Sequence, residues 1–266
     1  MRVGELQVTA LTDGTFIARP RYFGPDAVSH ARSDVFDRAG AAWLPIGSFL
    51  VRAGGRTILV DAGLGPQLQQ LPEDMYLVGG QLLTGLRAAG VDREEITDVV
   101  CTHLHADHVG WLFDEQAVPV FPAATIWFGA GDWHHFVDGP GEMAPHIERG
   151  LRGSAQLKLL DQDTTVARGV DAIMTPGHTP GHLSVALDGG PERFLLLGDA
   201  ITCPVQLEQP TWHSMGDVDP ALAERTRERL WQALADPRTT GVGAHFPELR
   251  SGRVTSTEPR RWDAAT

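Results

Sequence analysis

The stretch THLHADHVG, residues 102–110, contains three histidines and one aspartate within six positions. Side chains in an extended segment repeat every two residues, so His103 and His105 face the same side, while Asp107 and His108 follow at the turn. Neutral imidazole is the commonest protein ligand for zinc-like ions, and three or more protein ligands are needed to hold one. The stretch therefore predicts half of a metal site and requires partner ligands elsewhere in the chain.

Three later stretches supply candidate partners. TPGHTPGHLS places His178 and His182 on a turn rich in glycine and proline, where the backbone can bend around an ion. FLLLGDA places Asp199 at the exit of a buried strand, where a carboxylate without a cation is costly. GVGAHFP places His245 at the end of another strand. Sites in layered α/β folds are usually assembled at strand ends along one edge, so all four residues are candidate ligands.

The order of strands and helices predicts the fold. Hairpins are expected across Asp13-Gly14, across Gly54-Gly55 and across residues 188–190, with helices over residues 81–89 and 219–236. Each half of the chain runs from hairpin strands through a helix to a strand that ends in metal-type residues. Two such halves packed sheet against sheet, with helices outside, give a four-layer αββα sandwich. A single domain over residues 1–266 is expected.

Two segments, residues 19–45 and 63–80, carry no sustained hydrophobic period. Long irregular connections of this kind are usually functional or disordered, and the aromatic residues of the first segment favour a packed loop that covers a pocket. The stretch GVGAHFP is expected to form the last strand of the ordered core. Substrate selection is therefore assigned to the two loops.

Charge and composition limit the partners. The formal net charge is −12, from 22 basic and 34 acidic residues, which disfavours nucleic acid because a phosphate backbone requires a positive face. The chain shows neither a signal-peptide core nor an apolar run of membrane-spanning length, so a cytoplasmic protein without a membrane partner is expected. Its two cysteines are too few for a disulfide scaffold, although Cys203 is a candidate pocket residue. A small-molecule substrate is expected, with a homodimer left open.

These motifs, in order and spacing, resemble the metallo-β-lactamase-fold superfamily of dinuclear hydrolases over nearly the whole chain. The matching elements are HxHxDH, TPGHTPGH, GDA and AHFP. The resemblance implies seven ligands: His103, His105 and His182 on one metal, Asp107, His108 and His245 on the second, and Asp199 bridging both. It also implies that the second histidine of TPGHTPGH is the ligand, so that His178 is structural.

The resemblance further implies the cofactor and the nucleophile. Two divalent cations are expected, Zn²⁺ by ligand preference, with iron, cobalt or manganese competing through availability. A hydroxide that bridges two such ions has a pKa of about 7 or lower and is a nucleophile at neutral pH. Asp107 is the candidate catalytic residue that carries a proton to the leaving group. Asp61, which closes ILVDAG, resembles an aspartate that hydrogen-bonds a ligand histidine from behind.

The substrate pocket is less well defined by the sequence. Its predicted lining residues are Trp111, Tyr22, Phe23 and Thr202. Many lactonases of this superfamily place a tyrosine a few residues after the bridging aspartate, where it hydrogen-bonds the lactone carbonyl, but residues 200–203 of this chain are Ala-Ile-Thr-Cys. The chain has only two tyrosines, Tyr22 and Tyr76, and either is a candidate for that role.

Departures within the superfamily narrow the expected function. Class B3 β-lactamases lack the bridging aspartate and flavodiiron proteins have a glutamate at the position of His105, so both classes are disfavoured. HADHVGW and GDAITCPVQ are similar to the branch of lactonases and methyl-parathion-hydrolase-like enzymes. Hydrolysis of a small ester or lactone is therefore expected, with phosphotriesters as a side activity. The alternatives are a glutathione-thioester hydrolase, an iron-dependent sulfur dioxygenase and a non-catalytic ligand-binding member.

Overall fold

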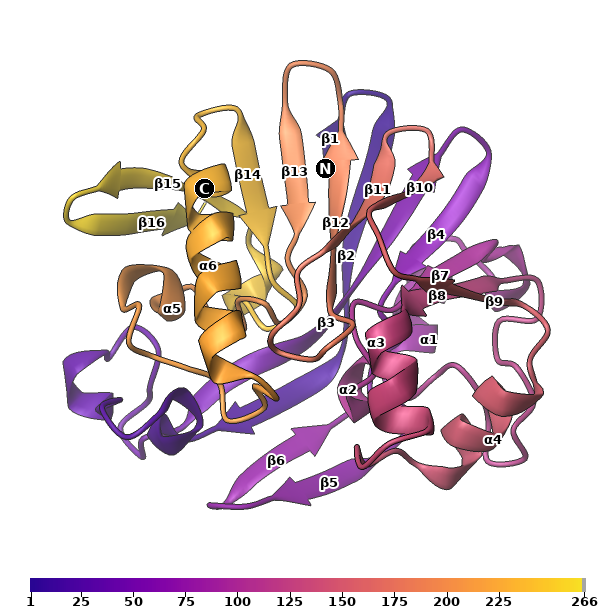
Figure 1. Cartoon of the computed structure of the whole chain (residues 1–266), viewed down its shortest axis with the longest axis horizontal. Coiled ribbons are helices and arrows are strands. Elements are labelled where there is room, and N and C mark those ends of the chain that lie inside the picture. Colours follow the sequence, from indigo (N-terminus) through magenta and orange to yellow (C-terminus); the bar gives the residue numbers. More distant parts are fainter. Residues whose placement is uncertain (265–266) are drawn as a thin grey trace.

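Two β-sheets pack face to face in the computed structural model, which describes residues 1–264 (Figure 1). The strands of the first sheet are β1 (Arg2–Val3), β2 (Leu6–Ala18), β3 (Ala42–Ala53), β4 (Arg56–Val60), β5 (Leu68–Leu71), β6 (Met75–Val78), β7 (Asp98–Val100), β8 (Thr125–Gly129) and β9 (Leu157–Leu160). They follow the order β5-β6-β2-β3-β4-β7-β8-β9, with β1 paired to β2.

The second sheet contains the strands that follow. They are β10 (Thr164–Ala167), β11 (Val170–Met174), β12 (Leu183–Asp188), β13 (Arg193–Leu196), β14 (Thr239–Val242), β15 (Gly252–Thr257) and β16 (Arg260–Ala264), paired in that order. The helices are α1 (Leu82–Ala88), α2 (Ala106–Val109), α3 (Ala130–Asp132), α4 (Pro145–Gly153), α5 (Val205–Glu208) and α6 (Pro220–Leu234). No helix within residues 1–264 is long and apolar enough to cross a membrane.

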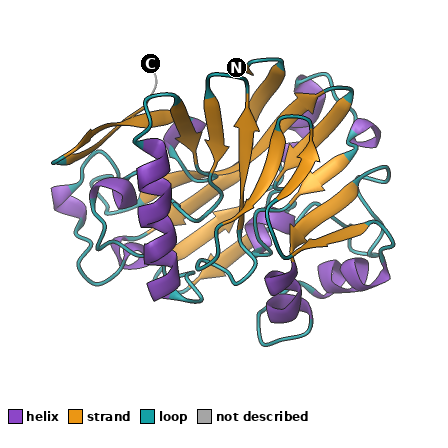
Figure 2. Cartoon of the chain, turned by 45° about the horizontal axis from the view of Figure 1, so that its top comes forward, coloured by secondary structure: helices purple, strands orange, loops and turns teal. Residues whose placement is uncertain are grey.

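Alternating side chains of the first sheet separate two hydrophobic layers. On β3, Phe49 and Val51 pack in the cluster between the sheets, together with residues of β11 to β14. Leu50 lies between them in sequence and packs in a second cluster with helices α1 and α4. Helix α6 packs against the inter-sheet cluster through Leu230 and Leu234. Helices therefore flank two facing sheets (Figure 2), and the predicted αββα sandwich is confirmed.

The sheets explain where a site forms. The pairs β4–β7 and β13–β14 are parallel, so their carboxyl ends lie at the same edge of each sheet. Asp61 directly follows β4, and the histidine-rich stretch follows β7. Asp199 and His245 follow β13 and β14 within three residues. Loops that leave the carboxyl ends of parallel strands carry the candidate ligands, as expected for an open α/β sheet, except that His178 and His182 follow the antiparallel strand β11.

Two predicted hairpins and two predicted helices are confirmed. Strands β3 and β4 pair antiparallel across Gly54-Gly55, and β12 and β13 pair antiparallel across residues 189–192. Helix α1 ends just before Gly90, whose φ of 70° is the left-handed conformation that glycine adopts readily. Helix α6 begins after Asp219, whose carboxylate accepts a hydrogen bond from the N–H of Leu222.

The predicted hairpin at Asp13-Gly14 is wrong, because β2 runs through it as one strand with an irregularity between Thr12 and Gly14. Asp13 is buried, and its carboxylate accepts five hydrogen bonds from nitrogen donors. The donors are the N–H groups of Leu64, Gly65, Gly80 and Leu82 and the indole of Trp111. The aspartate thus joins three chain segments instead of turning the chain.

Two other segments are more regular than predicted. Residues 63–80 contain the hairpin of β5 and β6 rather than an irregular loop. The chain continues after His245 with β15 and β16, so GVGAHFP does not end the ordered core. In both cases the strands are short and lie at a sheet edge, where hydrophobic alternation is weak.

Candidate metal centre

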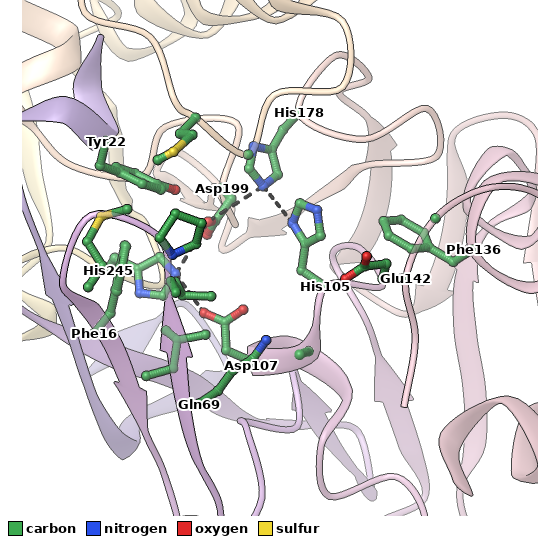
Figure 3. Close-up of a pocket in the computed structure, with 18 of the residues that line it drawn as sticks. Phe16, Tyr22, Gln69, His105, Asp107, Phe136, Glu142, His178, Asp199 and His245 are labelled. Atoms are coloured by element: carbon green, nitrogen blue, oxygen red, sulfur yellow. Dashed lines mark hydrogen bonds and ion pairs between the residues drawn. The ribbon is translucent and has the colours of Figure 1, made fainter. Parts of the chain in front are cut away.

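Seven side chains converge near the carboxyl ends of these strands. Figure 3 labels the members that face the cavity, which are His105, Asp107, His178, Asp199 and His245. They form three overlapping groups, and within each group the ligand-type atoms lie within 4.8 Å of one another. The groups are His103, His105 and His178; His103, His108 and Asp199; and Asp107, His108 and His245. Because His103 and His108 each belong to two groups, the three groups form one continuous cluster.

His178 occupies the position that the sequence assigned to His182. The Nε2 atom of His178 lies 3.0 Å from Nδ1 of His105 and 3.7 Å from Oδ2 of Asp199. The Nε2 atom of His182 instead accepts hydrogen bonds from the backbone N–H groups of Asp199, at 3.0 Å, and Ala200, at 3.1 Å. A nitrogen lone pair engaged by two backbone donors is not free for a metal. The assignment of His182 as a ligand and of His178 as structural is therefore corrected.

A buried carboxylate orients the ring of His178. Asp217 Oδ1 lies 2.9 Å from Nδ1 of His178, and Arg227 donates to Oδ2 of the same carboxylate at 3.1 Å. A proton on Nδ1 leaves the Nε2 lone pair directed at the cluster. No sequence signal pointed to Asp217, because it lies in the connection between α5 and α6 without a metal-type motif.

Asp61 supports the other side of the cluster. Its φ of 62° places it in the left-handed region, and its carboxylate is buried. Oδ1 accepts from the N–H of Thr102 at 2.7 Å, and Oδ2 lies 2.9 Å from both the Thr102 hydroxyl and Nδ1 of His108. The contact that the resemblance implied for Asp61 is thus present, and it directs Nε2 of His108 toward the cluster.

Asp132 ties the two ligand loops together. It is buried in α3 and accepts from the N–H of Leu104, which lies between His103 and His105, at 3.0 Å. It also accepts from the Thr179 hydroxyl at 2.9 Å and from the N–H of Gly181 at 2.6 Å, both within three residues after His178. One carboxylate therefore fixes the spacing between two separate chain segments, and the sequence assigned it no role.

Orphaned polar atoms show that the cluster fits a cation. His103 Nε2, His108 Nε2 and Asp199 Oδ1 are buried without a hydrogen-bond partner among the described residues. Leaving such atoms unpaired costs about 1–3 kcal/mol each, and a metal ion satisfies lone pairs of this kind directly. The donor set of imidazole and carboxylate suits zinc-like ions. These residues therefore fit a divalent metal centre.

The electrostatics beside the carboxylates of the cluster favour positive charge, whereas burial lowers the pKa values of His103 and His105 and keeps these imidazoles neutral. Burial alone would lower the pKa of His108, but the carboxylates of Asp61, Asp107 and Asp199 outweigh it and raise this pKa to about 9. Burial likewise opposes the charged form of His245, yet Asp199 and Asp107 raise its pKa well above the ordinary value. Carboxylates that hold protons on two buried histidines would hold a divalent cation in their place.

A cavity of about 440 Å³ opens onto the cluster. It exposes Asp107, His105, His178, Asp199 and His245 at its floor (Figure 3). Its apolar wall contains Phe16, Leu71, Met75, Leu77, Phe136 and Met215. The β5–β6 hairpin supplies three of these residues, so the segment predicted to cover the pocket does so as a hairpin.

Of the predicted pocket residues, only Tyr22 lines this cavity. Trp111 donates its indole hydrogen to Asp13 and packs beneath the first sheet, and Phe23 is fully buried in an aromatic cluster. Thr202 and Cys203 are also fully buried and do not line the cavity. Hydrophobicity alone does not distinguish a residue that faces a cavity from one that faces the core, which is why Phe16 and Phe136 were missed.

The fold and the ligand cluster define a metallo-hydrolase. Residues 41–245 match the model of the metallo-beta-lactamase superfamily, and the chain belongs to that superfamily.

Several other proteins and solved structures resemble the chain. A probable metallo-hydrolase of Mycobacterium tuberculosis is 27% identical over 217 residues, covering 71% of this chain and 67% of the relative. An N-acyl homoserine lactonase of Bacillus thuringiensis is 25% identical over 205 residues, covering 72% of this chain and 77% of the relative. The structure of AidC, a dizinc quorum-quenching lactonase, superposes with a TM-score of 0.87 at 25% identity, covering 100% of this chain and 96% of AidC.

Proposed function

We propose that this chain hydrolyses the ester bond of a small, uncharged lactone or ester at a centre of two divalent metal ions, Zn²⁺ by ligand preference. The single observation that carries the proposal is the cavity. It brings an apolar wall against a floor made of metal-type ligands. Such a cavity binds an apolar substrate chain and presents its carbonyl group to the ions. The similarity to lactonases supports the same bond type.

The seven residues of the cluster would hold the metals. His103, His105 and His178 would bind one ion, Asp107, His108 and His245 the second, and Asp199, which lies between the groups, would contact both. When bound, the two ions supply a water of lowered pKa as nucleophile and polarise the substrate carbonyl.

Asp107 is the candidate for proton transfer. Its carboxylate lines the cavity, and its Oδ2 atom lies 3.3 Å from Nε2 of His245. Burial raises the pKa of Asp107, but His108 and His245 outweigh burial and lower it to about 2. The carboxylate is therefore ionised at neutral pH, faces the substrate, and can accept a proton and pass it to the leaving alkoxide.

The cavity disfavours the glutathione-directed alternatives. A glutathione conjugate carries two carboxylates, which basic side chains recognise best. No lysine or arginine lines the cavity within the part of the chain that the structure describes, and Glu142 at its wall would repel an anion. The complete set of seven metal-type side chains, placed at an open cavity, also exceeds what ligand binding alone requires. This arrangement disfavours the alternative of a non-catalytic ligand-binding member.

A substrate panel tests the proposal directly. The metal-loaded protein is assayed against γ-lactones, aryl esters, phosphotriesters, β-lactams and a glutathione thioester, with metal content measured on the same sample. Turnover is expected on neutral lactones or esters, with about two metals per chain. The variant His105→Ala should lose activity and metal, while His134→Ala, an exposed histidine outside the cavity, should keep both. Full activity of metal-free protein, or turnover of the glutathione thioester alone, would refute the proposal.

A further inference from the structure

One wall of the cavity comes from a single segment, residues 133–142. Its lining residues are His135, Phe136, Gly141 and Glu142. The segment begins with one π-helical turn (Trp133–Val137), in which Phe136 packs edge-on against His105 with ring centroids 5.4 Å apart. Wide turns of this kind occur frequently at functional sites. The segment thus lies directly beside the ligand cluster, although no motif of the sequence marked it.

Close packing holds the end of this segment in place. The N–H of Gly141 donates to the carbonyl of His135 at 2.8 Å. A Cβ atom on Gly141 would lie 2.6 Å from the ring of Phe136 and 2.8 Å from the ring of His135, so the chain approaches both rings only because this residue has no side chain. The packing of Gly141 therefore sets the position of the residue that follows it, Glu142.

Glu142 brings to the cavity a negative charge that no lysine or arginine of the lining neutralises within residues 1–264. The residue is exposed, and Figure 3 shows its carboxylate pointing into the cavity from the side of His105 and Phe136. The other two carboxylates of the described lining, Asp107 and Asp199, belong to the ligand cluster. Glu142 is therefore the carboxylate of this lining that remains to act on a substrate or product.

Ester hydrolysis creates a negative charge inside this cavity. Water adds its oxygen to the acyl carbon, the acyl C–O bond breaks, and a neutral ester becomes an alcohol, a carboxylate and a released proton. A simple carboxylic acid has a pKa of about 4, so the acid product is an anion at neutral pH. Positive charge at the cluster, which favours a developing oxyanion, also retains this product. A fixed carboxylate in the wall opposes that retention and leaves a neutral substrate unaffected.

We propose that Glu142 sets the charge selectivity of the cavity, because it weakens the binding of substrates that carry a carboxylate and speeds the release of the carboxylate product. The proposal rests on the proposed hydrolysis of an ester or lactone, and it names the residue that makes uncharged substrates the preferred class. Glu142 acts through its charge across the cavity and not by contact with the reacting bond. Like charges that face each other across a partly hydrated cavity change an affinity about three- to tenfold.

A matched pair of esters tests the selectivity. The first, para-nitrophenyl pentanoate, is neutral. The second, para-nitrophenyl hydrogen glutarate, has the same chain length and a carboxylate in place of the terminal methyl group. In Glu142→Gln, kcat/KM on the glutarate ester should rise about three- to tenfold, while kcat/KM on the pentanoate ester should stay unchanged. Glu142→Asp keeps the charge and should keep most of the discrimination.

A control variant and salt separate local charge from other effects. Glu115 is also exposed but does not line the cavity, so Glu115→Gln changes the net charge equally and should leave the ratio of the two kcat/KM values unchanged. At about 1 M sodium chloride the Debye length is about 3 Å, so the gain of Glu142→Gln on the glutarate ester should largely disappear. A gain that persists at high salt would overturn the proposal, because it would mark an effect of shape.

Binding of the product gives a readout without turnover. In a calorimetric titration of metal-loaded protein, Glu142→Gln should bind pentanoate about three- to tenfold more tightly than wild type at unchanged metal content. Wild-type protein that hydrolyses neither these esters nor any lactone would refute the proposed function itself. Active wild type, together with a Glu142→Gln variant in which either the ester selectivity or the pentanoate affinity is unchanged, would overturn only the role of Glu142.

Discussion

Replacing Asp61 with asparagine isolates the support that a single carboxylate gives to His108, a candidate metal ligand. Asparagine adopts the left-handed region at least as readily as aspartate, so the φ of 62° adds no strain. Size and shape are also retained. What changes is that one of two acceptor oxygens becomes an N–H₂ donor, while three donors still face it.

Both orientations of the amide are unfavourable. With the nitrogen toward Thr102, a buried backbone N–H loses its acceptor, at a cost of about 1–3 kcal/mol. With the nitrogen toward His108, Nδ1 must become the acceptor, which moves the ring proton to Nε2. A protonated Nε2 cannot bind a metal. Mutations of such supporting groups typically weaken metal affinity 10- to 100-fold, about 1.4–2.7 kcal/mol, and we expect Asp61→Asn to fall in this range.

Competition with a chromophoric chelator measures the affinity, and denaturant unfolding of metal-free protein measures the fold separately. Asp74→Asn is the matched control, because Asp74 also has a left-handed φ, of 55°, but is exposed in the turn between β5 and β6. The control should change neither quantity by more than about 0.5 kcal/mol. Asp61→Asn with wild-type metal affinity and wild-type unfolding free energy would show that the carboxylate does not set the tautomer of His108.

Three further predictions concern the rest of the cluster. His178→Ala should reduce the metal content from about two ions to about one per chain. His182→Ala should keep the metal but lower the free energy of unfolding by about 1–3 kcal/mol, because two backbone N–H groups lose their acceptor. Equal metal loss in both variants would restore His182 as a ligand. Burial raises the pKa of Asp217, but His178 and Arg227 outweigh burial and lower this pKa below its ordinary value. The stability that the carboxylate contributes is therefore fully present above about pH 4, the pKa of an unfolded aspartate, and is lost as the pH falls through the lower pKa of the folded state. The difference in unfolding free energy between wild type and Asp217→Asn should thus be constant from about pH 8 to pH 5 and close below pH 4, and a gap that widens toward acid contradicts this. Removing metal with a chelator should lower the thermal unfolding midpoint and abolish hydrolysis. Ions that bind only the folded state stabilise it by about 2.7 kcal/mol when their concentration is a hundredfold above Kd. An unchanged midpoint argues against metal at this site.

The fold was predictable wherever local signals act alone. Gly-Gly pairs between apolar runs marked two hairpins, and the amphipathic pattern with its proline marked α6. Asp13-Gly14 carried the same local signal and formed no hairpin. Its carboxylate binds donors more than fifty residues away, and such contacts leave no trace in the neighbouring sequence.

The site was predictable in composition but not in every assignment. The spacing of the histidines and the strand ends identified six of the seven residues of the cluster. The seventh was assigned to His182 instead of His178, because TPGHTPGH offers two imidazoles four residues apart. Sequence cannot decide which of them faces the cluster, because the decision depends on Asp217 and on the backbone of Asp199, which are distant in sequence. The cavity wall was unpredictable for a related reason, since its residues have the same apolar character as the core.

The cluster lies where the two sheets meet, and their backbones approach closely there. The N–H of Leu183 donates to the carbonyl of Thr102 at 2.6 Å, so the strand after His182 is joined directly to the histidine-rich loop. Gly198 makes this approach possible, because its φ is 54° and a Cβ atom would lie 2.8 Å from both Thr102 and His182. The glycine of GDA therefore serves the site through absence of a side chain. Asp199 reaches the cluster because the residue before it leaves room for both halves of the chain to touch.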